Sequence, residues 1–519
     1  MNATVRRPGA WLAAAAAVAA GAVLIGHVRL DAAPPSFDEA WYLEVSFKLW
    51  NALSDGRLLD FAREYAGAFR FKAPLVSVLP LPFYAILGPS YDAAVLANIP
   101  ALALLAWSLY GLGRRFFSDA AGGLAAAFAL SFPLNAALSR LLFVETWLAA
   151  LTAAFLWRWA ESDALRRPAE APRLGVLLGL GLLSKVSFFI PPSLPVALSL
   201  REARPAERPL KLLLTVAAAI ALTWYAWNLV YVAGYAFKAS FGDIAAKYVT
   251  VPPWDPASLG RFLAALLREG PGYPGSLLLA LCLGLLGRRA LTEPGLRFAM
   301  AWLLPSIILV AASRSKDLRF LAAALPGAAL ALAGALDLVT RERRARLPIL
   351  TGALALSWTV FALQAAGRAP SLARSDYGST SRPASAWDTE ALARTLSGAA
   401  GPGAVIVVGA EHRQLNANIL SAWAVRDRLP VTFIHYGHME GRVEAAVARL
   451  SEKDATHILF VDGLQPDQLP SMVPGVDAAL RALVKRGALP FKDAGAVAIG
   501  GDLTGKLWRR EGTIRMSGS

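Results

Sequence analysis

The sequence predicts an α-helical membrane protein with about 11–13 transmembrane helices and a soluble α/β domain in its C-terminal part. Of its 519 residues, 56% are hydrophobic and only 17% are charged. A soluble protein of this length needs about 25% charged residues to cover its surface, so much of this surface is expected to face lipid. The single cysteine, Cys282, lies in an apolar run, which excludes a disulfide framework and a thiolate metal site.

Eleven apolar runs define the predicted membrane helices. They cover residues 10–30, 92–112, 118–136, 141–157, 174–184, 186–200, 212–236, 275–287, 298–313, 320–339 and 347–366. The runs at 174–184 and 186–200 are shorter than the roughly 20 residues of a straight span, which favours tilted, broken or re-entrant helices. The first run follows Arg6 and Arg7 as in a signal sequence, but its length and the later runs favour an uncleaved helix.

The basic residues predict the orientation of these helices. Clusters of Arg and Lys lie between the runs at 113–115, 166–173, 201–211, 287–297 and 341–346. With a cytoplasmic N-terminus all of them face the cytoplasm, which explains the net charge of +15 better than nucleic-acid binding does. This parity requires that residues 72–88 do not span the membrane, and their three prolines disrupt a continuous helix. Long outer loops are then expected at 31–73 and 237–274.

The C-terminal part has a different composition. We expect a membrane domain over 1–366 (its outer loop 31–73 carrying an acidic motif), a Ser/Arg/Pro-rich linker over 367–386 and an external domain over 387–519. Apolar, β-branched stretches predict buried strands, and helical spacing separates them, so a parallel sheet is expected. The strands are expected at 403–410, 431–437, 457–463 and 496–501. The first strand ends in a single glycine, Gly409, which argues against a dinucleotide-binding turn.

Charged residues on the predicted outer side are the candidate functional residues. They are Asp38 and Glu39 after the first helix, Lys72, Arg140, Glu145, Lys185, and the turn with Arg314, Lys316, Asp317 and Arg319. A charge at the centre of a membrane helix costs roughly 2.5–3.5 kcal/mol, so such residues line a cavity or pair with one another. Cations suit a lipid-linked phosphate, and a carboxylate suits the removal of a proton from an attacking hydroxyl or amine. Sugar transfer from a polyprenyl phosphate needs both.

Structural explanations exist for many of these residues. Asp38–Glu39 would also serve as a helix N-cap or a solvated loop start, and Lys72 and Arg140 as cations that reach the membrane interface. The turn around Lys316 would also be an ordinary polar loop. His435 and His438 lack a third ligand and are not assigned to a metal. Trp224, Trp227 and Trp302 are interpreted as an interfacial belt.

Taken in order, these features resemble the membrane glycosyltransferases of the GT-C type, in the protein O-mannosyltransferase and aminoarabinose lipid A transferase superfamily. The resemblance covers roughly residues 10–345. Its motifs are Asp38–Glu39 in "FDEAWY", "FKAPL" with Ala73 where relatives have proline, the Arg140–Glu145 pair with Glu where many have Asp, Lys185 in "GLLSKVS", and Lys316, Arg319, Phe320 and Pro326 in a "K-x-x-R-(F/Y)-x-x-x-x-x-P" segment.

The resemblance implies a GT-C-like fold and an inverting transferase in the plasma (inner) membrane, acting on its periplasmic or extracellular face. The donor is a polyprenyl- or dolichyl-phosphate sugar, and the acceptor is a lipid, a glycan or a protein. Asp38 is implied as the base or as the carboxylate that orients the acceptor. Glu39 and Glu145 are implied to support it or to hold the acceptor and the sugar. The implied phosphate and sugar contacts are Lys72, Arg140, Lys185, Lys316 and Arg319. No cofactor is assigned, and a divalent metal stays an open alternative because some relatives need one and others do not.

Two other classes of function stay open. A transporter or flippase of a lipid-linked sugar would also use intramembrane charges and broken helices. A structural or assembly protein would use the external domain to bind partners, and its membrane charges would be dispensable. The long acidic outer loop and the α/β domain favour an enzyme.

Overall fold

A computed structural model describes residues 7–30, 33–202, 206–248, 251–377, 387–437, 441–464, 473–500 and 503–514. The chain forms two compact units. Unit 1 contains Met1–Leu30, Tyr65–Pro80 and Val95–Ser381. Unit 2 contains Asp31–Glu64, Leu81–Ala94 and Arg382–Ser519. The predicted domain boundaries at 366 and 387 stay predictions, and linker residues 378–386 lie outside the described residues.

Each predicted apolar run overlaps a helix. These helices are α1 (Pro8–Leu30), α7 (Ile99–Phe116), α8 (Asp119–Ser131), α10 (Glu145–Glu161), α11 (Ala171–Ser184), α12 (Ile190–Glu202), α13 (Glu207–Ser240), α16 (Gly272–Leu286), α18 (Pro294–Ala312), α19 (Leu325–Thr340) and α20 (Arg346–Ala365). Five helical segments of the described chain are long and apolar enough to cross a membrane: Pro8–Leu30, Tyr91–Phe116, Glu207–Ala246, Pro294–Ala312 and Arg346–Ala365. The predicted class, a helical membrane protein with a C-terminal α/β domain, is confirmed, whereas the larger number of spans stays a prediction.

Short helices connect these segments. They are α3 (Leu58–Gly67), α4 (Leu75–Val78), α5 (Leu81–Leu87), α6 (Tyr91–Leu96), α9 (Pro133–Leu138), α14 (Asp243–Tyr248), α15 (Pro256–Glu269) and α17 (Arg289–Thr292), with 3₁₀ turns η1 (Pro168–Glu170), η2 (Val186–Phe189), η3 (Leu318–Leu321) and η4 (Ser371–Ala373). The proline-rich segment is divided into α4 and α5, as its prolines predict. The division between the two units falls at the same place, between Pro80 and Leu81.

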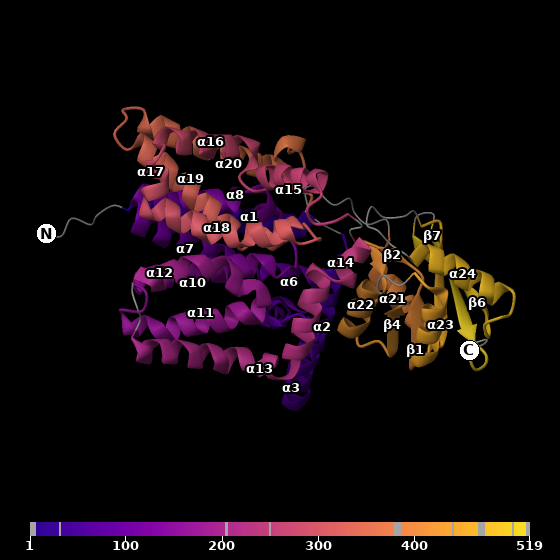
Figure 1. Ribbon diagram of the computed structural model, residues 1–519. Helices are drawn as coiled ribbons and strands as arrows, with labels where there is room; N and C mark the ends of the chain where they lie inside the picture. Colours follow the sequence, from indigo (N-terminus) through magenta and orange to yellow (C-terminus); the bar gives the residue numbers. More distant parts are fainter. Residues whose placement is uncertain are drawn as a thin grey trace. The chain divides into compact units, whose positions relative to one another are not determined.

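Small residues let the helices of unit 1 approach closely. Helices α10, α11 and α13 pack in sequence, side by side (Figure 1). A Cβ atom added at Gly175 or Gly179 in α11 would lie 2.7 Å from Val216 or Ile220 of α13. Close packing of this kind holds helices together where lipid removes the hydrophobic driving force between them.

Two tryptophans interpreted as belt residues are instead buried in unit 1. Trp224 and Trp302 are both fully buried, and their indole nitrogens donate to the backbone oxygens of Ala68, at 3.2 Å, and Ala323, at 3.0 Å. A buried indole N–H needs such a partner, which explains the contacts. Trp227 is 71% exposed, so the belt interpretation remains only for this residue.

The sheet of unit 2 is mixed, with strand order β4-β1-β5-β7-β6. Strands β1 (Ala404–Val408), β4 (Val431–His435) and β5 (His457–Asp462) are parallel, whereas β6 (Phe491–Gly500) and β7 (Leu503–Arg510) pair antiparallel. The prediction of a parallel sheet is therefore wrong for its last two strands. Two residues separate β6 from β7, and so short a link permits only an antiparallel pair.

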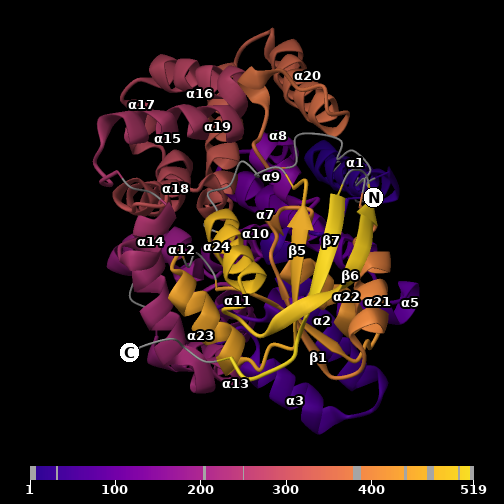
Figure 2. The same ribbon diagram turned by 90° about the vertical axis from the view of Figure 1, so that its right-hand side faces the viewer.

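Helices cover both faces of this sheet (Figure 2). Helices α23 (Val443–Glu452) and α24 (Val473–Lys485) bury Leu450 and Leu480 against Ile458 and Phe460 of β5. Helices α21 (Thr389–Ala400) and α22 (Ala417–Arg426) lie on the other face. A small hairpin of β2 (Glu411–His412) and β3 (Leu415–Asn416) follows β1.

Helix α2 (Phe37–Ser54), which begins with the acidic motif, packs on α22 within unit 2. The Asn51 amide donates to the backbone oxygen of Val425 at 2.8 Å, and Arg428 pairs with Asp55 at 2.7 Å. Through these contacts the α/β domain holds the helix of the acidic motif in place.

Candidate functional site

The acidic motif of unit 2 forms a helix start in which Glu39 is fully buried. Ser36 is the N-cap of α2, and its hydroxyl and backbone N–H donate to Glu39 Oε2 at 2.6 and 3.1 Å. The Ser36 side chain also accepts from the backbone N–H of Glu39, which completes a capping box. The Tyr91 hydroxyl donates to Glu39 Oε1 at 2.5 Å. Both oxygens of Glu39 thus accept hydrogen bonds from other residues of unit 2. The N-cap of α2 is Ser36 and not Asp38.

Asp38 lies in the first turn of α2 and is half-buried. The positive end of the helix dipole stabilises a carboxylate at this position, typically by 0.3–1 kcal/mol. The preceding residue is also held, because the Asn418 amide of α22 donates to the backbone oxygen of Phe37 at 3.4 Å. Neighbours on both sides therefore fix the backbone of Asp38.

Glu145 and Lys185 form a partly buried ion pair in unit 1. Glu145 begins α10 and is 2% exposed, and Lys185 Nζ donates to its Oε1 at 2.9 Å. Lys185 has extended backbone angles (φ −160°, ψ 138°) because it separates α11 from η2. The two residues are 40 positions apart in the chain. The pairing agrees with the expectation that intramembrane charges meet one another.

The second carboxylate oxygen of Glu145, Oε2, is buried but unlike Oε1 takes no part in the ion pair. Among the described residues it has no hydrogen-bond partner, and neither does the hydroxyl of Thr146 beside it. Both residues line a small cavity with Asn135, Leu138 and Ala149 among its other walls. A buried polar atom without a partner costs about 1–3 kcal/mol, more when it is charged, so it points to a bound molecule or water.

A second cation, Arg319, lies beside this pair. Asp317 caps η3, accepting from the backbone N–H of Arg319 at 3.0 Å and pairing with its Nε at 2.8 Å. The guanidinium lies 5.5 Å from the ring centre of Phe143 and 5.6 Å from that of Phe320. Lys185 Nζ lies 4.6 Å from the same Phe320 ring. We call Glu145, Lys185, Asp317, Arg319 and Phe320 the cation cluster.

The remaining predicted cations also lie in unit 1. Arg140 is 6% exposed, and its Nε donates to the backbone oxygen of Ala136 at 3.2 Å. Lys316 donates to the backbone oxygen of Ser313 at 2.8 Å. Burial lowers the pKa of Lys316, and the negative charge of Asp255 opposes this shift.

Lys72 is half-buried and follows a strained turn. Phe69 and Arg70 have positive φ angles of 54° and 61°, a region that costs residues other than glycine about 1–3 kcal/mol. Helix α13 holds the turn: the Asn228 amide donates to the oxygen of Ala66 at 2.7 Å, and Tyr235 stacks on Phe71. This anchoring fixes the segment that carries Lys72.

No described group of three or more His, Cys, Asp or Glu side chains is arranged to hold a metal. In the cation cluster, Glu145 and Asp317 each face a cation. His438 lies outside the described residues.

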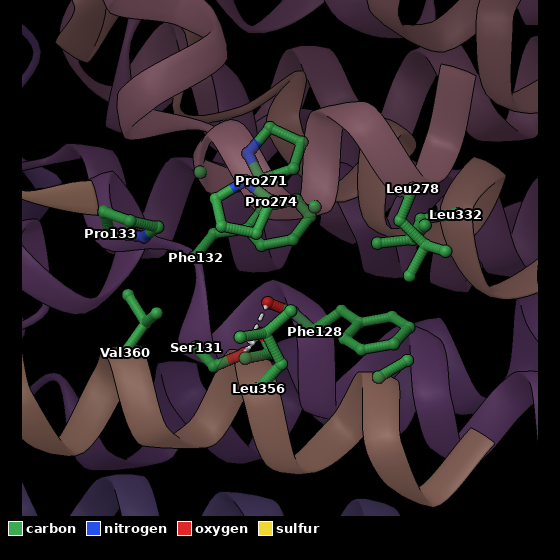
Figure 3. Close-up of a pocket in the computed structure, with 14 residues that line it drawn as sticks. Phe128, Ser131, Phe132, Pro133, Pro271, Pro274, Leu278, Leu332, Leu356 and Val360 are labelled. Atoms are coloured by element: carbon green, nitrogen blue, oxygen red, sulfur yellow. Dashed lines mark hydrogen bonds between the residues drawn. The ribbon is translucent and has the colours of Figure 1, made fainter. Parts of the chain in front are cut away.

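A cavity in another part of unit 1 has a different character. It lies among α8, α16, α19 and α20, and the volume of about 420 Å³ between its walls includes space open to solvent (Figure 3). Its walls include Phe128, Leu278 and Leu332, and its polar feature is a hydrogen bond of 2.6 Å between Ser131 and Ser357. No predicted site residue is among its lining residues. Such walls suit an alkyl chain and not a phosphate.

Comparisons with known proteins agree with the sequence motifs. Residues 72–227 match the family model for dolichyl-phosphate-mannose-protein mannosyltransferase. A search of curated protein sequences finds no significant match.

Several solved structures share the fold. ArnT from Cupriavidus metallidurans, bound to undecaprenyl phosphate, has a TM-score of 0.60 at 15% identity, over 95% of this chain and 97% of that one. The archaeal oligosaccharyltransferase AglB from Archaeoglobus fulgidus, in complex with an inhibitory peptide and a dolichol-phosphate, has a TM-score of 0.53 at 12% identity, over 86% and 69%. Arabinofuranosyltransferase AftD from Mycobacteria has a TM-score of 0.53 at 15% identity, over 98% of this chain and 42% of that one. Residues 72–227 thus match a mannosyltransferase family model, and the chain shares the fold of these solved glycosyltransferase structures, which agrees with the resemblance seen in the sequence.

Proposed function

We propose that the protein is an inverting glycosyltransferase that moves a sugar from a polyprenyl-phosphate donor to a lipid, glycan or protein acceptor. The reaction takes place on the periplasmic or extracellular face of the inner membrane. The observation that carries the proposal is the cation cluster, in which Lys185 and Arg319 both lie near the ring of Phe320. Beside them is the buried carboxylate of Glu145, which pairs through one oxygen and has no hydrogen-bond partner for the other among the described residues. The lipid phosphates bound to ArnT and AglB support a donor of this class.

Each part of the cation cluster has a role in holding the donor. Lys185 and Arg319 bind the phosphate, and a guanidinium offers it two parallel hydrogen bonds. The unpaired oxygen of Glu145 accepts a hydrogen bond from a sugar hydroxyl. Lys72, Arg140 and Lys316 supply further contacts to phosphate or sugar. Because the leaving phosphate gains negative charge during the reaction, fixed cations stabilise the transition state more than the bound donor.

Asp38 acts as the general base. The acceptor oxygen attacks the anomeric carbon, its proton passes to the Asp38 carboxylate, and the bond from that carbon to the phosphate oxygen breaks. Polyprenyl phosphate leaves with the electron pair, so a single displacement inverts the anomeric centre. Glu39 is a positioning residue, because its capping box and the Tyr91 contact fix the first turn of α2.

An assay in lipid nanodiscs tests this function. Purified protein is supplied with a panel of polyprenyl-phosphate sugars and an extract of cell-envelope acceptors, and release of polyprenyl phosphate is measured. We expect Asp38→Asn to reduce transfer by about 10²–10⁴-fold, the usual contribution of a general base. Asp60→Asn is the control, because the side chain of Asp60, in unit 2, is 40% exposed and pairs with Arg57 at 2.8 Å.

The outcomes separate the proposed function from its alternatives. Transfer by Asp38→Asn equal to that of the wild type contradicts the base assignment. Movement of the intact donor across a bilayer, without cleavage of its phosphate bond, would favour a flippase instead.

A further inference from the structure

The chain that follows α20 returns to the end of α15. Ser375 is fully buried, and its hydroxyl donates to Glu269 Oε2 at 2.6 Å. The backbone N–H of Asp376 donates to the same oxygen at 3.2 Å. Arg268 Nη2 bridges Glu269 Oε1, at 2.6 Å, and Asp376 Oδ2, at 2.7 Å. These four residues, which we call the Glu269 clamp, fix the backbone immediately before Tyr377.

Tyr377 extends from the clamp to the cation cluster. Its hydroxyl donates a short hydrogen bond to Asp317 Oδ1, the oxygen that also caps the backbone of Arg319. Burial raises the pKa of Tyr377, and the negative charge of Asp317 raises it further, so the phenol remains a proton donor. Arg319 and Glu145 also lie close enough to affect this titration.

The hydrogen bond changes how strongly Asp317 holds Arg319. A carboxylate attracts a guanidinium less when a second donor shares its charge, and the members of a hydrogen-bonded network affect one another. Without the Tyr377 hydroxyl, Asp317 would draw the Arg319 side chain closer and neutralise more of its charge. Less of that charge would then be available to a lipid-linked phosphate.

We infer that Tyr377 is a positioning residue for donor binding, acting on Arg319 through Asp317 and held in place by the Glu269 clamp. The inference rests on the proposed function. It assigns a role to residues 375–377, in which no sequence motif indicates a site.

The test is Tyr377→Phe, which removes one hydroxyl and leaves the ring. We expect the KM for the polyprenyl-phosphate sugar to rise about 10-fold, as for the loss of one hydrogen bond that serves a charged group, with kcat changed less than about 2-fold. Tyr110→Phe is the matched control, since it removes a similar bond of 2.8 Å to Asp119 in the same unit.

A double-mutant cycle shows whether the effect passes through Asp317. In an Asp317→Asn background, Tyr377→Phe should change the donor KM much less than it does in the wild type. Glu269→Gln, which keeps the shape of the clamp, should raise the donor KM about 3-fold and serves if Tyr377→Phe folds poorly.

The results that overturn the inference differ from those that overturn the function. If the wild type transfers sugar and Tyr377→Phe has the wild-type KM, Tyr377 has no role in donor binding. An equal rise in KM for Tyr110→Phe would mean a general effect on the fold. If the wild type transfers sugar from none of the donors, it is the proposed function that fails.

Discussion

Two buried carboxylates in unit 1 differ in how completely they are paired. Asp337, in α19, is fully buried, and its oxygens accept from Ser118 at 2.8 Å, Arg341 at 2.8 Å and Arg346 at 2.6 Å. Glu145, in α10, is 2% exposed and pairs with Lys185 through one oxygen, while the other has no hydrogen-bond partner among the described residues.

We propose that this contrast distinguishes a carboxylate that stabilises the fold, Asp337, from one that binds substrate, Glu145. Asp337 joins the start of α8, the end of α19 and the start of α20. Because both of its oxygens are paired, these contacts offset the free-energy cost of removing the carboxylate from water. The second oxygen of Glu145 lacks a hydrogen bond among the described residues, although nearly all buried polar atoms in stable proteins have one. We interpret the unpaired oxygen as the place of a substrate hydroxyl.

Of these two carboxylates, Glu145 is expected to have the larger effect on transfer. Glu145→Gln keeps the shape of the side chain but removes the charge that accepts a sugar hydroxyl and pairs with Lys185. Because hydrogen bonds to charged groups contribute about 1.5–3 kcal/mol, we expect kcat/KM for the donor to fall about 100-fold. Thermal unfolding measured alongside should change little, because the variant relieves an unsatisfied buried charge. A variant that unfolds more easily and transfers sugar normally would reverse the assignment.

The opposite pattern is expected at Asp337. Asp337→Asn leaves two arginines without their carboxylate and should destabilise the fold by about 1–3 kcal/mol, seen as a lower Tm in detergent. Transfer per folded molecule should stay at the wild-type level. A loss of transfer without a loss of stability would show that complete pairing is no sign of a structural role.

An effect on transfer between those at Glu145 and Asp337 is expected at Glu39. Both of its oxygens are paired, as in Asp337, but it lies next to the proposed base Asp38. Glu39→Gln should weaken the capping box and loosen the first turn of α2. We expect kcat to fall about 10-fold through misplacement of Asp38, with the donor KM unchanged. The split between kcat and KM is the measurement, and an increase in KM alone would place Glu39 in donor binding instead.

Much of the fold follows from local sequence. The apolar runs became helices because their length and composition act within each segment, and β1, β4 and β5 are continuous apolar strands. Strand β7 was missed because "LTGKLWRR" mixes small, charged and apolar residues, and its pairing with β5 is made by residues far away in the chain.

The site was predictable only in part. The cost of intramembrane charge singled out Glu145 and Lys185, which pair across 40 residues. The spacing of Ser36 and Glu39 ahead of a helix is a capping-box signal that would have identified the true cap. Tyr377 carries no such signal, because it follows a polar segment and contacts Asp317 60 positions earlier.

The affinity of the protein for a polyprenyl phosphate tests the proposed donor site most directly. Lys185→Gln keeps a hydrogen-bond donor for Glu145 but removes the cation, and Lys211→Gln is its control, as Lys211 forms an exposed pair with Glu207 at 2.5 Å. With undecaprenyl phosphate in nanodiscs, we predict at least about 10-fold weaker binding for Lys185→Gln and unchanged binding for the control. Equal affinities for the wild type and Lys185→Gln would contradict a lipid-phosphate site at the cation cluster.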